Sequence, residues 1–182
     1  LHKLSAAPHH LKSDILELIN KETTNAQNGI ESKIFLKMNS LVDPDVMIAL
    51  YNASKAGVKI ELVIRGICCI RPGIPGVSEN IQVRSIIGRF LEHSRIYIFH
   101  NNGNPKIFLA SADCMPRNFE KRIEVMFPVT DEKLKTKILK IKEYILKDNV
   151  KARILSADGR YEILTPRDNK PFNSQMELPQ IT

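Results

Sequence analysis

The chain has 182 residues, of which 43% are hydrophobic and 26% are charged, a composition typical of one soluble globular domain with a sizeable core. Its apolar runs are too short for a helix that spans a bilayer. The net charge of +7 favours polyanionic partners but does not distinguish nucleic acid, anionic membrane and inorganic phosphate.

The first half of the chain predicts a βαβ unit. The expected elements are a helix, a strand, a helix and a strand, over residues 11–29, 33–40, 43–57 and 58–65. The second helix has the clearest boundaries, because Asp43 suits the N-cap, Pro44 the first helical position and Gly57 the residue after the last turn. Because the connections are short, the two strands should lie parallel with a right-handed crossover.

Residues 65–80, RGICCIRPGIPGVSEN, contain three Gly and two Pro and predict a structured loop. The loop follows a strand, and α/β sheets bind ligands where such strands end. Four further strands are expected, at residues 81–86, 95–100, 106–111 and 122–129. The sequence NNGNP predicts a hairpin-like turn between the second and third of these strands.

An amphipathic helix is expected over residues 130–149, with lysines opposite an apolar stripe at Leu134, Ile138, Ile141 and Ile145. A small hairpin follows over residues 150–165. From Pro166 onward the sequence is typical of a tail. We therefore expect one domain over residues 1–165 and a C-terminal tail over residues 166–182.

The cysteines and the start of the chain bear on its compartment. Three cysteines, of which Cys68 and Cys69 are adjacent, match neither a disulfide framework nor the spacing of a zinc site. We expect reduced thiols in the cytoplasm, with Cys68 and Cys69 as small buried residues. The start, LHKLSAAPHHLKSD, has no apolar segment of a signal peptide and no initial Met, which favours a piece of something longer.

Arginines and one histidine gather in the middle of the chain. The arginines, a residue type suited to forked binding of phosphate oxygens, are Arg65, Arg71, Arg84, Arg89 and Arg95. In EHSRIYIF, His93 stands two residues before Arg95 at the start of an expected strand. A neutral imidazole can attack phosphorus, and a protonated imidazole can donate its proton to a leaving oxygen. An adjacent cation stabilises negative charge on the phosphate oxygens. A histidine at a strand start is also commonly structural.

The stretch from His93 to the turn Ser111-Ala112-Asp113 resembles half of a phospholipase D-type site. In that superfamily a His-x-Lys strand is followed by a Gly-Ser-x-Asn-like turn, and two such halves meet. This sequence departs from the pattern twice, because Arg95 replaces the lysine and the turn reads Ser-Ala-Asp.

A longer resemblance covers about residues 1–165. It is carried, in order, by the strings KMNSLVDP, LYNASKAGVKIELVIRGICCIRPGIPG, SENIQVRSIIGRFLEHSRIYIF and SADCMPRNFEKRIEV, which resemble the C-terminal domain of bacterial polyphosphate kinase of the first type. The resemblance implies an α/β fold, a phospholipase D-like domain with a mixed β-sheet flanked by helices. It implies an enzyme that reversibly transfers the terminal phosphate of ATP to inorganic polyphosphate, with Mg²⁺, through a phosphohistidine on a preceding domain.

The resemblance assigns roles by matched position. Arg65 in VIRGICC is implied to contact the nucleotide phosphates, although an ion pair with Glu61 or Glu79 is the alternative. His93 in FLEHSR is implied to bind phosphate or to protonate the departing oxygen, and Arg95 to bind phosphate. The family's phosphorylated histidine and its Mg²⁺-contacting residues have no counterpart in this sequence. We therefore expect the second half of an active site, inactive alone.

Three more residues are candidates for a supporting role. Asp113 either orients the imidazole of His93 or caps the MPRNF turn. Arg117 and Asn118 either complete the phosphate cradle or stabilise that turn. One or two of four arginines are candidates to line a polyphosphate channel, and the others to lie on the surface; the four are Arg71, Arg84, Arg89 and Arg95.

The partners implied are ATP or ADP, polyphosphate, the preceding domains of the same polypeptide and a second copy in a homo-oligomer. The resemblance argues against nucleic acid as a partner. Two other functions stay open: a dimeric phospholipase D-like nuclease or phosphodiesterase, and a non-catalytic polyanion-binding module. The basic surface also leaves membrane association open.

Overall fold

The computed structural model describes residues 4–166 and 170–178. Its strands are β1 (Ser5–Ala7), β2 (Lys33–Met38), β3 (Lys59–Ile64), β4 (Ile81–Ile86), β5 (Arg95–Phe99), β6 (Lys106–Ala110), β7 (Glu124–Pro128), β8 (Ala152–Leu155) and β9 (Tyr161–Ile163). Its helices are α1 (Leu11–Gln27), α2 (Pro44–Lys55), α3 (Pro116–Glu120), α4 (Glu132–Lys147) and α5 (Ser174–Glu177). Among the described residues no helix is both long and apolar enough to cross a membrane.

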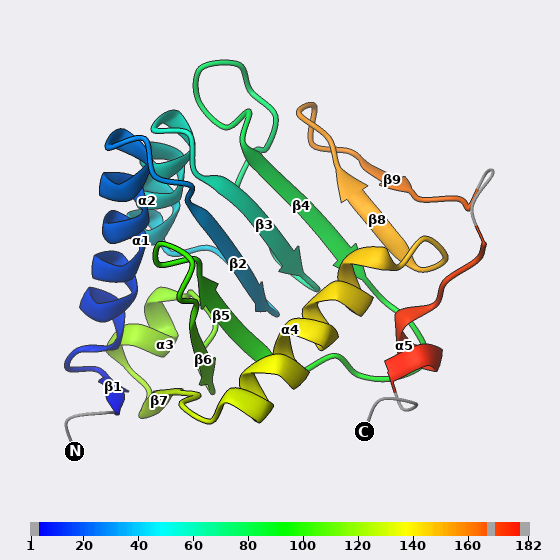
Figure 1. Ribbon diagram of the computed structural model, residues 1–182. Coiled ribbons are helices and arrows are strands. Elements are labelled where there is room, and N and C mark those ends of the chain that lie inside the picture. The colour runs from blue at the N-terminus through cyan, green and yellow to red at the C-terminus, as the bar shows by residue number, and fades with distance from the viewer. Residues whose placement is uncertain (1–3, 167–169, 179–182) are drawn as a thin grey trace.

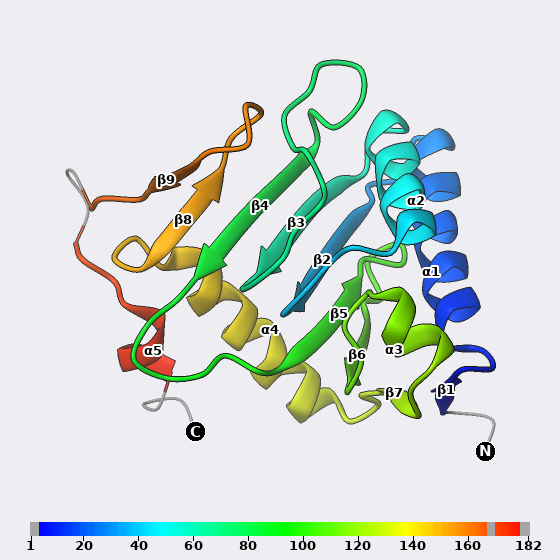
Figure 2. The same cartoon turned by 180° about the vertical axis from the view of Figure 1, so that it is seen from behind.

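The strands form one mixed sheet in the order β1-β7-β6-β5-β2-β3-β4-β8-β9. The pairs β2–β3 and β3–β4 are parallel, and the others are antiparallel. Helices α1, α2 and α3 lie on one face and α4 crosses the other, as the two opposite views show (Figures 1 and 2). The predicted α/β class, mixed sheet and βαβ unit are confirmed.

Local sequence explains where the elements begin and end. The Asp43 side chain accepts hydrogen bonds from the backbone N–H groups of Asp45 and Val46, so it is the predicted N-cap of α2. Gly57 follows α2 with φ of +98°, a conformation that glycine adopts without strain. Strand β1 and helices α3 and α5 were not predicted; they have only 3, 5 and 4 residues, too few for a periodic pattern.

The core has two layers, one on each face of the sheet. Strand β2 is buried from Ile34 to Met38 because it is central and both of its faces are covered. On the α4 face, Ile138 and Ile145 pack against the sheet, as the apolar stripe predicted. Leu134 is an exception to that stripe: it lies in the first turn of α4 with 53% of its surface exposed.

The topology brings four chain segments to one edge of the sheet. The parallel strands β2 and β3 both end there, and Asn39 and Arg65 follow them directly. Strand β5 runs antiparallel to β2, so Arg95 at its start lies at the same edge. Strand β6 pairs with β5 and ends there as well, which brings Asp113 to this edge. The sheet itself therefore holds Arg65 and Arg95, two of the predicted phosphate residues.

The segment after residue 166 is anchored where the structure describes it. The Asp148 carboxylate, at the end of α4, accepts hydrogen bonds from the backbone N–H groups of residues 150, 151 and 152. Its second oxygen accepts from the N–H and hydroxyl of Ser174, the first residue of α5. Burial raises the pKa of Asp148, but these hydrogen bonds outweigh it and hold that pKa below its ordinary value. The boundary at residue 166 stays a prediction.

Substitution of Asp148 by alanine should release α5 and lower the free energy of unfolding by about 2 kcal/mol, because five donors lose their acceptor. Urea unfolding measures the loss, and amide exchange at residues 174–177 reports the release. The exposed Glu143, paired with Lys147, provides the control Glu143→Ala. Equal stability of the two variants would contradict this role of Asp148.

Candidate functional site

Arg65 and His93 lie at the two ends of one chain of hydrogen bonds. Arg65 Nε donates to Asn39 Oδ1 over 2.9 Å, and the Asn39 backbone N–H donates to Asp113 Oδ1 over 2.7 Å. Arg95 binds the same carboxylate twice, through Nε to Oδ1 and Nη2 to Oδ2, each at 3.1 Å. Arg95 Nη1 also lies 2.8 Å from the carbonyl oxygen of His93 and 3.0 Å from its Nδ1.

Asp113 is the central residue of this network. Its side chain is buried, and the Asn39 side chain also donates to it. Burial raises the pKa of Asp113, but the hydrogen bonds and charge of Arg95 and the bonds from Asn39 outweigh it, so the pKa is below its ordinary value. Asp113 therefore holds Arg95 directly. It reaches His93 through Arg95, and not by the direct contact with the imidazole that the sequence suggested.

His93 is exposed and is oriented by Arg95. A guanidinium has donors only, and it faces both ring nitrogens of His93: Arg95 Nη1 lies 3.0 Å from Nδ1 and Nη2 lies 3.4 Å from Nε2. In the neutral ring one nitrogen accepts from Arg95 and the other carries the proton.

The ion-pair alternative for Arg65 finds no support among the described contacts. Glu61 pairs with Lys142 at 2.8 Å, and the Glu79 carboxylate accepts from the backbone N–H of Gly76. The described contacts of the Arg65 guanidinium use Nε alone, which leaves its terminal nitrogens for a ligand. The geometry fits a forked contact with phosphate oxygens.

Two of the predicted supporting residues lie apart from this network. Arg117 is exposed on α3. Asn118 is buried, and its Nδ2 donates to Glu124 Oε1 over 2.8 Å. Glu124 also accepts from the hydroxyl of Ser111, so this cluster fixes the turn between β6 and α3. The turn-stabilising interpretation fits the contacts of Asn118.

The other residues singled out in the sequence have varied environments. Arg84 is half-buried and donates to the Leu146 carbonyl over 2.6 Å, a structural contact to the end of α4. The prediction that both adjacent cysteines are buried is wrong for Cys69, which is exposed in the loop after β3. Cys68 is half-buried, and burial raises its pKa to about 11, so its thiol is protonated at neutral pH.

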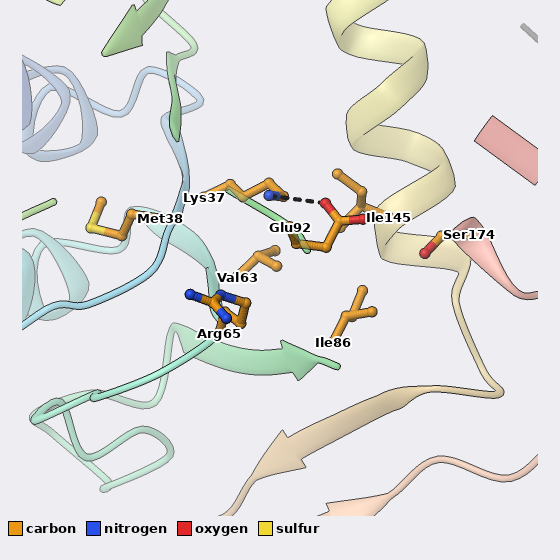
Figure 3. A pocket seen from close by; sticks show the side chains of 8 residues that line it. All are labelled: Lys37, Met38, Val63, Arg65, Ile86, Glu92, Ile145 and Ser174. Atoms are coloured by element: carbon orange, nitrogen blue, oxygen red, sulfur yellow. Dashed lines mark ion pairs between the residues drawn. The ribbon is translucent and has the colours of Figure 1, made fainter. Parts of the chain in front are cut away.

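Sequence reasoning missed Asn39 and Lys37. The only local sign of Lys37 is a charge within the otherwise apolar strand KIFLKM. Its side chain is buried in a small cavity beside the site, where it faces Glu92 (Figure 3). Arg65, Ser174 and apolar side chains complete the lining. The cavity has about 10 Å³, room for one water, so it is too small for a phosphate.

No group of three or more His, Cys, Asp or Glu side chains in residues 4–166 and 170–178 is placed to hold a metal ion. Since Mg²⁺ is commonly held by only one or two carboxylates together with substrate phosphates, no residue of this chain is assigned to the Mg²⁺ that the resemblance implies.

Comparison with known proteins matches the chain along nearly its whole length. Residues 4–175 match the family described as polyphosphate kinase C-terminal domain 2. A polyphosphate kinase of Pseudomonas aeruginosa is 54% identical over 179 residues, and one of Bacillus cereus is 48% identical over 177 residues. These matches cover 98% and 97% of this chain but 26% and 25% of the relatives. The chain thus spans about a quarter of the length of these relatives.

Solved structures give the same result. The crystal structure of polyphosphate kinase from Porphyromonas gingivalis matches with a TM-score of 0.94 and 40% identity, over 98% of this chain and 27% of that chain. A phospholipase D family member, Nuc from Salmonella typhimurium, matches with a TM-score of 0.55 and 19% identity, over 76% of this chain and 88% of that chain. The second likeness shows the phospholipase D-like fold alone.

Proposed function

The chain belongs to the polyphosphate kinase family, as C-terminal domain 2, and from this we propose that it supplies half of an active site for reversible transfer of the terminal phosphate of ATP to inorganic polyphosphate. The observation that supports the proposal most strongly is the hydrogen-bond network that holds Arg65 and His93 at one sheet edge. The other half of the site, with the phosphohistidine, comes from a preceding domain.

Arg65 binds phosphate oxygens of the nucleotide or of polyphosphate through its terminal nitrogens. Its Nε bond to Asn39 fixes the plane of the guanidinium before the ligand arrives. A fixed donor pair stabilises the charge that develops in phosphate transfer without reorganising first. Arg95 contributes positive charge nearby, although its bonds to Asp113 and His93 make it mainly a support of His93.

His93 acts at the oxygen that leaves phosphorus or at a phosphate bound beside it. When ATP donates its terminal phosphate, a ring nitrogen of the histidine on the preceding domain forms a bond to the γ-phosphorus, the bond between the γ-phosphorus and the bridging oxygen breaks, and ADP leaves with the electron pair. The ring N–H of His93 donates to that oxygen or to the adjacent phosphate. In the reverse direction the same group accepts the proton back.

The remaining partners are proposals from the family. They are ATP or ADP, polyphosphate, the preceding domains and a second copy of the polypeptide. Mg²⁺ is proposed for the complete enzyme, with ligands from outside this sequence. The proposed location is the cytoplasm, and association with a membrane through the basic surface is proposed as a secondary location.

Two assays test the proposed function. In the first, ATP labelled at its terminal phosphate is incubated with the 182-residue chain, and acid-labile phosphate on protein is counted. In the second, polyphosphate formation is measured for a fusion enzyme, in which this chain replaces the matched quarter of the Pseudomonas aeruginosa polyphosphate kinase. Arg65→Ala is compared there with Arg160→Ala, which removes an equal charge from an exposed turn.

The chain alone should acquire no label, and the fusion enzyme should form polyphosphate in a way that Arg65→Ala impairs and Arg160→Ala does not. Label on the chain alone, or an inactive fusion enzyme, would contradict the proposal. Cleavage of a simple phosphodiester by the chain alone would favour a phospholipase D-like hydrolase instead.

A further inference from the structure

The exposed His93 lies in a loop, residues 87–94, that forms no helix or strand between β4 and β5. A histidine that acts on phosphate must be held within a fraction of an ångström of its working position, about 0.5 Å. Arg95 orients the ring, but the backbone of an exposed loop needs separate support. Two buried polar side chains from distant parts of the chain supply that support.

Lys37 of β2 holds the residues on both sides of His93. Its side chain is only 4% exposed. Its Nζ donates to the Ser94 hydroxyl over 2.8 Å, lies 3.3 Å from the Ser94 carbonyl oxygen and pairs with Glu92 Oε2 at 3.2 Å. Burial lowers the pKa of Lys37, and the charge of Glu92 offsets part of that cost. A buried lysine that is paired in this way fixes one geometry.

Gln175 of α5 holds the same loop from the other side. Its Oε1 accepts from the Phe90 N–H over 3.0 Å, and its Nε2 donates to the Phe90 carbonyl over 2.8 Å and to Glu92 Oε1 over 3.0 Å. The residue is buried, with only 4% of its surface exposed. Gly88 approaches this amide so closely that an added Cβ would overlap Gln175 Oε1. Because Ser174 is anchored to Asp148, α5 is a firm support.

We propose that Lys37 and Gln175 are positioning residues for His93, which meet at the Glu92 carboxylate and fix the loop on both sides of the histidine. Neither side chain has a contact with His93 among the described hydrogen bonds, so both act through residues 90, 92 and 94. The inference rests on the proposed function, since it assigns these residues to the positioning of a phosphate-binding histidine.

A purely structural role makes a different prediction from a positioning role. If the ion pair of Lys37 and Glu92 mattered for stability alone, a double variant that removes both charges would restore both the stability and the order of the loop, because it leaves no unpaired buried charge. If Lys37 positions His93, the double variant regains stability but not the order of the loop, because Ser94 still lacks its donor.

The test compares Lys37→Met, Gln175→Ala, Gly88→Ala and the double variant Lys37→Met with Glu92→Gln. Matched controls are Lys33→Met at the start of β2 and the exposed Met176→Ala in α5. Nuclear magnetic resonance of the 182-residue chain, without ligand, measures amide exchange of residues 90–94 and the ring signals of His93. Kinetics of the fusion enzyme give kcat and KM separately, and thermal unfolding follows stability.

We expect faster amide exchange over residues 90–94 and broadened His93 ring signals in all four test variants, and in neither control. In the fusion enzyme kcat should fall on the order of tenfold, with KM for ATP little changed, because a displaced His93 imidazole slows the chemical step. Lys37→Arg, which keeps the charge and donors, should recover part of the kcat.

Unchanged loop exchange in Lys37→Met and Gln175→Ala would overturn the inference, whatever the enzyme does. Full recovery of loop order in the double variant would overturn it as well. Failure of the proposed function is separate, because the loop measurements need no ligand. If the fusion enzyme is inactive while the loop is released as expected, the structural support stands and its assignment to phosphate chemistry falls.

Discussion

Substitution of His93 by glutamine in the fusion enzyme is expected to lower the rate of polyphosphate formation by about 10²–10⁴-fold, the range of a general acid or base. Glutamine keeps hydrogen-bonding capacity and similar bulk, but it transfers no proton near neutral pH. The loss should appear mainly in kcat, because the contribution of His93 is largest when charge develops on the departing oxygen.

The control for this experiment is His100→Gln. His100 directly follows β5, at the opposite end of that strand from Arg95, and its Nδ1 lies 2.9 Å from the Glu31 carbonyl oxygen. Initial rates over a range of ATP concentrations give kcat and KM for both variants. If the His93→Gln enzyme has the rate of the parent, His93 has no chemical role. If only KM rises and kcat is unchanged, His93 binds substrate but takes no part in the chemical step.

The second large effect is expected for Asp113→Ala, which should lower the free energy of unfolding by about 3–5 kcal/mol. The Arg95 side chain is only 11% exposed and would lose both hydrogen bonds that neutralise it. Asn39 would also lose the acceptor of its backbone N–H. Urea unfolding measures the change. The control Asp158→Ala, which breaks an exposed pair with Arg160, should cost under about 1 kcal/mol.

The charge of Asp113 also predicts how the stability of the folded protein depends on pH. Because its pKa in the folded protein is below the unfolded value, the ionised carboxylate adds stability that is complete above about pH 4 and is lost as pH falls through the folded pKa. The stability difference between the parent chain and Asp113→Asn should therefore shrink in acid. A difference that is constant across that range, or no destabilisation in Asp113→Ala, would contradict the central place of Asp113.

Most of the fold followed from local sequence. The punctuation of α2 by Asp43, Pro44 and Gly57 and the apolar runs of the strands predicted the βαβ unit and the sheet edge to which Arg65 belongs. Strand β1 was not predicted, because its three residues form a strand through pairing with β7, which is distant in the chain. Such tertiary pairing leaves no periodic signal.

The site was predictable only in part. Arg65, His93 and Arg95 carry a chemical pattern in the sequence, but the residues that hold them do not. Lys37 contacts a residue 57 positions away, and Gln175 one 85 positions away, so no local pattern connects them to the histidine. Gln175 falls in the segment predicted as a tail, where a polar residue is ordinary.

The most direct test of the central claim, that Arg65 and His93 form one phosphate site, is calorimetric titration of the 182-residue chain with polyphosphate. Arg65→Ala, His93→Ala and the charge-matched Arg160→Ala are titrated in parallel. Single-stranded DNA of matched charge and two salt concentrations separate specific binding from charge attraction, which falls steeply with salt. We predict preference for polyphosphate and weaker binding in both site variants but not in Arg160→Ala. Equal binding of DNA and polyphosphate, unaffected by Arg65→Ala and His93→Ala, would contradict the account.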